Sequence, residues 1–166
     1  MVAMAHASEE PTGFVLTLAG EDAALSLGAR LAAVCRPGDV IALWGGLGMG
    51  KTVVARGAVR ALLGADEEVP SPTFTLVQPY DGPDFTLYHF DLYRLNDPDE
   101  AFELDIEDAF AEGLSLIEWP ERLGPYLPAG RLDLRLSPGD GENRRRVTLS
   151  GGGDWTERLK RAELHD

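Results

Sequence analysis

The chain of 166 residues lacks several features that mark specialised classes of protein. Cys35 is its only cysteine, which excludes a framework of disulfides and a metal site built from cysteines. No stretch approaches the roughly 20 consecutive apolar residues of a membrane-spanning helix, and residues 1–11 lack the basic start and apolar run of a secretory signal. We therefore expect a cytoplasmic protein without membrane contact. Its length predicts one domain over residues 13–166, after a disordered tail over residues 1–12.

Positive charge is also scarce. The chain has 15 Lys and Arg residues against 28 Asp and Glu residues, which gives a net charge of −13 at pH 7. This balance argues against direct binding of nucleic acid through its phosphates. Acidic residues concentrate between Asn96 and Glu121, a segment with ten Asp and Glu residues and no Lys or Arg. Two interpretations of this segment remain open: a solvated helix face, or a docking surface for a basic partner.

Lysine is the scarcer basic residue, since only Lys51 and Lys160 stand among the 15 basic side chains. Lys51 lies in the segment Gly-Gly-Leu-Gly-Met-Gly-Lys-Thr (45–52), which fits the phosphate-binding pattern G-x-x-x-x-G-K-[S/T] at every fixed position. The planar fork of arginine cannot replace a compact ammonium between phosphates. A lysine at this place in an arginine-rich chain therefore strengthens the prediction of a nucleoside triphosphate site.

Each fixed position of this loop has a physical role. Gly45, Gly48 and Gly50 allow a left-handed backbone that comes close to phosphates, and the N–H groups of the turn and of the following helix form an anion site. Lys51 is expected to reach the β- and γ-phosphates, and the Thr52 hydroxyl to bind Mg²⁺. The predicted nucleotide-binding residues of the loop are Gly45, Gly46, Leu47, Gly48, Met49, Gly50, Lys51 and Thr52.

The flanking sequence supplies the strand and the helix that such a loop needs. The apolar run Val40–Trp44 predicts a buried strand, and residues 53–63 predict a helix that ends at Gly64. Further strands are predicted over 14–18, 71–77, 85–90, 114–117, 131–136 and 145–149, and further helices over 21–34, 97–110 and 155–164. Strands 71–77 and 85–90 are expected to form an antiparallel hairpin. The fold class is α/β, a P-loop NTPase-like three-layer fold with a mixed sheet.

Two carboxylates follow apolar strands, where a triphosphate site needs an acidic group. Asp91 comes after residues 85–90, and Glu118 comes after residues 114–117. Either is suited to hold Mg²⁺, directly or through water, while the other orients the attacking water. His89, inside the first strand, is expected to be structural. The predicted catalytic residues are Lys51, Asp91 and Glu118, and the predicted metal-binding residues are Thr52, Asp91 and Glu118.

A protein that hydrolyses nucleotide also needs a group that senses the γ-phosphate. Thr73 and Thr75 follow the loop helix, where switch threonines lie in other P-loop proteins, although ordinary β-propensity explains them equally well. The chain has no Asn-Lys-x-Asp motif, which disfavours a GTPase. It has no Arg-rich lid segment after the site, which disfavours a small-molecule kinase.

Four segments together resemble one family. Besides residues 45–52, they are Ser-Pro-Thr-Phe-Thr-Leu-Val (71–77), His-Phe-Asp-Leu-Tyr-Arg-Leu (89–95) and Ile-Glu-Trp-Pro-Glu (117–121). The chain resembles the TsaE family, the small ATPases required in bacteria for making threonylcarbamoyladenosine in tRNA. The resemblance runs from about Glu21 to Arg122, and residues 126–166 match it only loosely.

The resemblance implies that the chain binds ATP and Mg²⁺ and hydrolyses ATP weakly on its own. It implies TsaD and TsaB as partners, which transfer the threonylcarbamoyl group, while ATP hydrolysis resets their complex between rounds. Transfer RNA would be contacted only indirectly, through that complex. The alternatives are a nucleotide-sensing module that does not hydrolyse ATP and a small-molecule kinase.

The resemblance also bears on single residues. It makes Glu118 the better match for a magnesium ligand, places Thr73 in a switch-like loop, and matches Glu21 to a position near the nucleotide base. The chain departs from the family at Gly46, where Asp is usual, and at Met49, where Ala is usual. Both are free positions of the loop pattern, so we expect binding to survive and the missing carboxylate at 46 to bear on water positioning or turnover.

Overall fold

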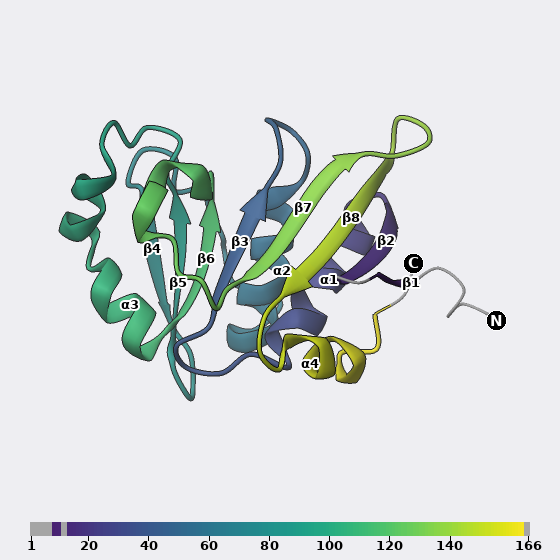
Figure 1. The fold of residues 1–166 in the computed structure, drawn as a ribbon, viewed down its shortest axis with the longest axis horizontal. Helices are drawn as coiled ribbons and strands as arrows, with labels where there is room; N and C mark the ends of the chain where they lie inside the picture. Colours follow the sequence, from purple (N-terminus) through teal and green to yellow (C-terminus); the bar gives the residue numbers. More distant parts are fainter. Residues whose placement is uncertain (1–7, 11–12, 165–166) are drawn as a thin grey trace.

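The strands of the chain form one mixed sheet. The computed structural model describes residues 8–10 and 13–164, and its eight strands follow the order β1-β2-β8-β7-β3-β6-β5-β4 (Figure 1). They are β1 (Ser8–Glu10), β2 (Gly13–Ala19), β3 (Val40–Trp44), β4 (Val77–Asp81), β5 (Thr86–Asp91), β6 (Leu114–Glu118), β7 (Leu132–Pro138) and β8 (Arg144–Gly151). β3 is parallel to β6 and β7, and β5 is parallel to β6, whereas the other pairs are antiparallel. The predicted α/β fold with a mixed sheet is confirmed.

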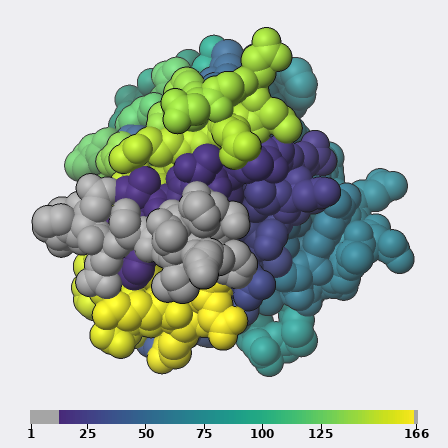
Figure 2. Space-filling view, turned by 90° about the vertical axis from the view of Figure 1, so that its right-hand side faces the viewer, coloured from purple at the N-terminus to yellow at the C-terminus, as the bar shows by residue number. Residues whose placement is uncertain are grey.

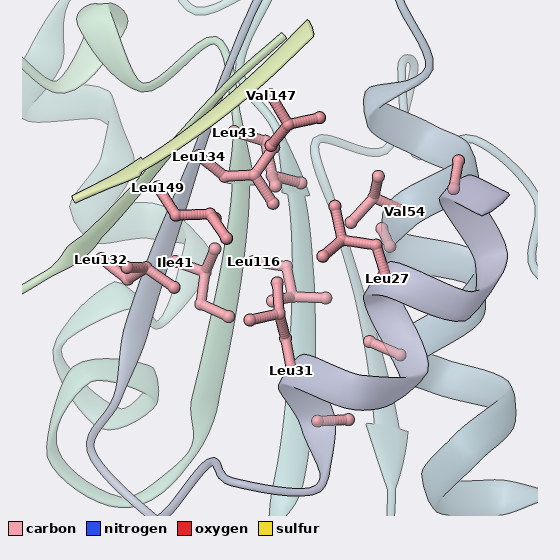
Figure 3. Close-up of a cluster of buried hydrophobic side chains, with 14 of the residues drawn as sticks. Leu27, Leu31, Ile41, Leu43, Val54, Leu116, Leu132, Leu134, Val147 and Leu149 are labelled. Atoms are coloured by element: carbon pink, nitrogen blue, oxygen red, sulfur yellow. The ribbon is translucent and has the colours of Figure 1, made fainter. Parts of the chain in front are cut away.

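Helices cover both faces of this sheet, so the fold has three layers. They are α1 (Glu21–Ala32), α2 (Lys51–Leu63), α3 (Ile106–Glu112) and α4 (Trp155–Arg161), with the 3₁₀ helices η2 (Pro98–Leu104) and η3 (Pro120–Tyr126). α1, α2 and α4 enclose one apolar core, and α3, η2 and η3 enclose a second. Figure 3 shows Leu27 and Leu31 of α1 and Val54 of α2 directed at the apolar side chains of the central strands. Figure 2 views the end of the sheet where β2 lies between the β7–β8 hairpin and α4.

Burial explains the patterns that the strands carry in the sequence. Every residue of β6 is buried, because helices cover both of its faces, and its sequence therefore shows no alternation. In β7 the buried and more exposed residues alternate, with Leu132, Leu134 and Leu136 on the face of α1 and α2. None of the described helices combines the length and the apolar character needed to cross a membrane.

The predicted hairpin is confirmed, but its first strand is not where the sequence places it. β4 covers Val77–Asp81 and pairs antiparallel with β5, so the expected strand over 71–77 is wrong. Residues 71–76 form a loop that is closed by a hydrogen bond from the Leu76 N–H to the Pro72 carbonyl, at 2.7 Å. Leu76 has a left-handed φ of 69°, which no extended strand accommodates. We call residues 71–76 the 71–76 loop.

The acidic helix predicted over 97–110 is also two elements. η2 ends at Leu104, and α3 begins at Ile106, because the intervening Asp105 has a left-handed φ of 58°. Asp97 starts η2 by accepting a hydrogen bond from the Asp99 N–H, in a capping box with Glu100. The charged face therefore bends instead of following one helix axis.

Within the tail predicted over residues 1–12, the structure places a strand. Ser8–Glu10 form β1, which pairs antiparallel with β2. Disorder therefore does not apply to these three residues, and the rest of that segment lies outside the described residues. η3, which follows β6 directly, has no counterpart among the elements predicted from the sequence.

α4 is tied to the start of β3 by a buried arginine. The two Nη atoms of Arg158 donate to the two carboxylate oxygens of Asp39, at 2.5 and 3.1 Å. Arg158 also donates to Asp154 and to the carbonyl of Val34. The side chains of Arg158 and Asp39 are only 7% and 12% exposed, and hydrogen bonding to Asp39 raises the pKa of Arg158. Asp39 directly precedes β3, so this bidentate pair fixes α4 against the strand that leads into the glycine loop.

Replacement of Arg158 by Met is expected to destabilise the fold by about 3–5 kcal/mol, because it leaves the Asp39 carboxylate buried without its partner. The matched control is Arg36→Met, which removes an exposed ion pair to the same Asp154 and should cost only about 0–1 kcal/mol. Urea denaturation followed by circular dichroism measures both. Equal losses in the two variants would contradict the role assigned to Arg158.

Candidate functional site

The glycine loop lies between β3 and α2, at the carboxyl ends of the central parallel strands (Figure 1). Gly48 and Gly50 have left-handed φ values of 77° and 108°, as the pattern predicts. α2 begins at Lys51 directly after Gly50, so the first N–H groups of the helix have no carbonyl partner within it. The loop and the helix start therefore offer the positive end of α2 to an anion.

A cavity of about 330 Å³ opens next to the start of α2. Its lining unites most of the predicted site residues, namely Leu47, Gly48, Met49, Gly50, Lys51, Thr52, Thr73, Asp91 and Glu118, together with Val53, Ser71 and Trp119. Gly45 and Gly46 belong to the loop but do not line this cavity. A larger depression of about 660 Å³, over β2 and β8, contains none of the predicted site residues.

Glu21 lies in a neighbouring cavity of about 200 Å³. This second cavity is enclosed by the start of α1, the glycine loop and the β7–β8 hairpin, with Glu21, Asn143 and Arg145 as its polar side chains. It shares Gly48, Met49, Gly50 and Val53 with the first cavity. The two cavities therefore meet at the glycine loop, and one elongated ligand would contact both.

Strand register brings the two carboxylates together. Asp91 and Glu118 are paired residues of the parallel strands β5 and β6, and Leu43 of β3 pairs with Glu118 on the other side. Side chains alternate along a strand, and Leu87 and Leu116 pack in the core under α2. Asp91 and Glu118 are an even number of positions from these leucines, so they point to the same face, where α2 begins. Both are buried, at 5% and 3% exposure.

Each carboxylate has its own hydrogen-bond partners. The Thr52 hydroxyl lies 3.0 and 2.9 Å from the two oxygens of Glu118, and Nε2 of His89 lies 2.6 Å from Oε2 of Glu118. Asp91 accepts from the Thr73 hydroxyl at 3.0 Å and from the Tyr93 N–H at 3.1 Å. Glu118 is thus connected to the glycine-loop helix, and Asp91 is connected to the 71–76 loop.

Lys51 lies at the base of the cavity and is 4% exposed. Its Nζ donates to the carbonyl of Gly45 at 2.5 Å and stands 3.5 Å from the centre of the Trp119 ring. Burial lowers the pKa of the Lys51 ammonium, while Glu118, Glu121 and Asp91 act in the opposite direction. Neither the Gly45 carbonyl nor the Trp119 ring carries a negative charge, so these two contacts do not neutralise the Lys51 ammonium.

The oxygen donors at this edge suit one kind of metal. Thr52, Asp91 and Glu118 offer a hydroxyl and two carboxylates, hard ligands of the type that Mg²⁺ uses when phosphates and water complete its shell. In the described part of the chain no three His, Cys, Asp or Glu side chains are grouped to hold a metal by themselves. The residues present therefore fit a magnesium ion shared with a phosphate ligand.

Sequence reasoning missed one residue of the neighbouring cavity. The sequence shows one basic run, Arg144-Arg145-Arg146, at the start of an alternating strand, which predicts side chains that face solvent or flank the strand and no nucleic-acid patch. Arg144 and Arg146 are exposed, but Arg145 is half-buried. Its Nη2 lies 3.5 Å from the carbonyl of Gly48, and its Nε is buried without a partner among the described residues. The signal was present in the alternation of β8, since Arg145 is two positions before the core residue Val147. Arg145 therefore belongs to the surroundings of the glycine loop.

A glycine loop between a central parallel strand and a helix, with carboxylates at the ends of the adjacent strands, defines a P-loop α/β protein.

Comparison with known proteins identifies one family within this class. The family model "Threonylcarbamoyl adenosine biosynthesis protein TsaE" matches residues 18–147. The chain is 38% identical to the tRNA threonylcarbamoyladenosine biosynthesis protein TsaE of Rickettsia bellii over 76% of this chain and 88% of that protein. It is equally 38% identical to the protein of that name from Bacillus subtilis, over 77% of this chain and 79% of that one.

The fold comparison agrees with these relatives. The crystal structure of Bacillus subtilis YdiB superposes with a TM-score of 0.74 at 28% identity, over 93% of this chain and 97% of that chain. The chain therefore belongs to the TsaE family, as the four sequence segments predicted.

Gly50 and Gly46 allow a direct test of the loop geometry. A Cβ would meet nothing within 4 Å at either position, but only Gly50 has a left-handed φ, of 108°. Gly50→Ala should destabilise the fold by about 1–2 kcal/mol through backbone strain alone, whereas Gly46→Ala should be neutral or stabilise it by up to about 1 kcal/mol. Urea denaturation of both variants checks this difference, and a Gly50→Ala variant as stable as Gly46→Ala would refute the described loop conformation.

Proposed function

We propose that this chain is the ATP-binding and ATP-hydrolysing subunit of the bacterial machinery that makes tRNA threonylcarbamoyladenosine, and that it acts on the complex of TsaD and TsaB through turnover of Mg-ATP. The observation that carries the proposal is the contact between Thr52 and Glu118. It joins the phosphate loop to a strand-end carboxylate, the pair of groups that a triphosphate with its metal requires. Family membership supplies the pathway, and the geometry supports the chemistry.

The two joined cavities support ATP as the ligand. The triphosphate fits the cavity at the start of α2, where Lys51 would leave the Gly45 carbonyl to contact the phosphates. The nucleoside fits the neighbouring cavity, which combines the apolar Leu18 and Met49 with the polar Glu21. Because the glycine loop lines both cavities, its N–H groups would bind the phosphates that connect the two parts of the nucleotide.

The two carboxylates receive different roles in this proposal. Mg²⁺ bound with the nucleotide would neutralise phosphate charge, held by Thr52 and Glu118, which are already in contact. Asp91 would support the metal or the attacking water from the other side. Its hydrogen bond to Thr73 connects Asp91 to the 71–76 loop. Hydrolysis of the bound nucleotide would therefore change the conformation of that loop.

The described site favours a slow enzyme that needs its partners. Arg94 and Arg122 are the arginines nearest in sequence to the site motifs, yet neither lines the cavity. The guanidinium carbon of Arg94 stands 4.6 Å from the Phe74 ring centre, and that of Arg122 stands 5.8 Å from the Tyr93 ring centre. Arg145 lines only the neighbouring cavity, so no arginine of the described residues lines the cavity proposed for the triphosphate. The charge that develops on the phosphates would therefore be stabilised by a group that a partner supplies or orders. With a net charge of −13, the chain would meet tRNA only through the complex.

Measured ATP hydrolysis tests the proposal. The isolated chain should turn over less than about one ATP per second, below the usual range of enzymes, and addition of TsaD and TsaB should raise the rate. Glu118→Ala should retain ATP binding and lose hydrolysis. A nucleotide-sensing module would hydrolyse ATP in neither protein, and a kinase would be stimulated by nucleosides or sugars instead of the partner pair. Rapid turnover by the isolated chain would rule out the partner dependence.

The acidic segment supports a docking surface for those partners. We call the exposed faces of η2 and α3 the acidic surface; it carries Glu103 and Glu107, which are both exposed. Two large aromatic residues accompany them, Phe102 at 44% and Tyr126 at 37% exposure, with ring centres 4.8 Å apart. The two rings pack edge to face, and the Tyr126 hydroxyl donates to Asp99. They form an exposed apolar patch beside the charges, and aromatic residues are enriched in protein interfaces.

Charge reversal at Glu103 and Glu107 should weaken binding to the TsaD–TsaB pair by about tenfold at low ionic strength and reduce its salt dependence. The matched control is Glu68→Lys combined with Glu157→Lys, because it also reverses two exposed charges, and both lie outside the acidic surface. Calorimetry at two salt concentrations measures the affinity of each variant for the partner pair. It distinguishes a contact of the acidic surface with the partners from a general effect of the net charge. Equal losses of affinity in both variants would show that binding depends only on the net charge of the chain. Unchanged affinity in the Glu103 and Glu107 variant would show that the acidic surface is only a solvated face.

A further inference from the structure

His89 is fully buried although its side chain is polar. It lies on β5 two residues before Asp91 and is 0% exposed. Its register partner on β6 is Leu116, which packs in the core under α2. Burying an imidazole costs free energy unless its polar atoms are hydrogen-bonded. Among the described residues the ring makes one hydrogen bond, to Glu118.

That bond is directed at a single carboxylate oxygen. Nε2 of His89 lies 2.6 Å from Oε2 of Glu118, and an ionised carboxylate only accepts, so Nε2 carries the hydrogen and donates. The other ring nitrogen, Nδ1, is buried and has no partner within the described residues. Among the described residues Glu118 is therefore the ring's one hydrogen-bond partner, and the ring's donor is directed at that carboxylate.

Glu118 is consequently held from two sides. Thr52 donates to it from α2, at 2.9–3.0 Å, and His89 donates to it from the sheet. Asp91 has a different arrangement, because its partners are Thr73 of the 71–76 loop and the N–H of Tyr93. One site carboxylate is thus anchored to the core of the sheet, while the other depends on a loop.

His89 does not line the cavity that Glu118 lines, so it acts from behind the carboxylate and does not reach a bound nucleotide. We propose that His89 is a positioning residue, which fixes the orientation of the Glu118 carboxylate toward Thr52 and toward the metal of a bound Mg-ATP. Because Oε2 already accepts from the ring, the remaining lone pairs of the carboxylate are directed at Thr52 and the cavity. This inference rests on the proposed function, since it assigns His89 a task only if Glu118 serves a nucleotide-bound metal.

Three substitutions at one position separate positioning from packing. His89→Leu removes the donor and keeps an apolar side chain in the core. His89→Gln and His89→Asn both carry an amide, but only Gln is long enough to place its N–H group where Nε2 lies, whereas Asn reaches the position of Nδ1. A merely structural role would separate the two amides only in thermal stability, through their difference in volume, whereas a positioning role would separate them in Mg²⁺ dependence.

The main readout is the Mg²⁺ concentration at which a non-hydrolysable ATP analogue binds fully, measured by calorimetry. His89→Leu and His89→Asn should raise it about 10–100-fold, the usual loss when a group supporting a metal ligand is removed. His89→Gln should restore most of the wild-type value. Affinity for the analogue in excess EDTA should be equal in all four proteins, because the phosphate loop is intact. The kcat of ATP hydrolysis with the partner pair should follow the same order.

Thermal unfolding identifies variants that do not fold, and if His89→Leu fails to fold, the comparison of Gln with Asn decides the question. Wild-type Mg²⁺ dependence in the Leu variant, or equal behaviour of Gln and Asn, would overturn the positioning role. An equal loss of analogue binding in EDTA would overturn it as well, since the defect would then lie outside the metal. If the wild-type chain binds no analogue even with Mg²⁺, the proposed function itself fails and this inference falls with it.

Discussion

The parallel register of β3, β6 and β5 is the constraint on which the rest of the site depends. It places Leu43, Glu118 and Asp91 at the same level of the sheet, so the glycine loop that follows β3 begins beside both carboxylates. A shift of β6 by one residue would turn Glu118 to the opposite face, away from α2 and into the apolar core under α3. The hydrophobic residues that lock this register thus also determine which acids meet the phosphate loop.

The parts of the site that the sequence predicts are those with a local physical origin. The loop at 45–52 is recognisable because its glycines supply left-handed backbone and its lysine and threonine have fixed roles. Asp91 and Glu118 are recognisable because each ends an apolar run, and the structure places both at the predicted edge of the sheet. The central strand Val40–Trp44 is predicted to the residue, since both of its faces are buried and its neighbours are turns.

What the sequence could not predict depends on contacts between distant segments or on unmarked backbone conformations. Leu76 and Asp105 both take left-handed φ values although neither is a glycine. The sequence pattern therefore predicts a strand and a helix that continue through these two breaks. The bond between His89 and Glu118 joins residues 29 positions apart, and only strand pairing reveals it. Arg145 required the alternation of β8 to be combined with the position of the hairpin beside the glycine loop.

The buried contact of Arg158 with Asp39 has a consequence for where the functional unit ends. The family model matches residues 18–147, whereas α4 lies after this range, and its Arg158 binds Asp39, the residue before β3. The glycine loop follows β3 directly, so the position of this loop depends partly on α4, near the end of the chain. The position of the glycine loop therefore depends on a guanidinium that lies outside the residues matched by the family model.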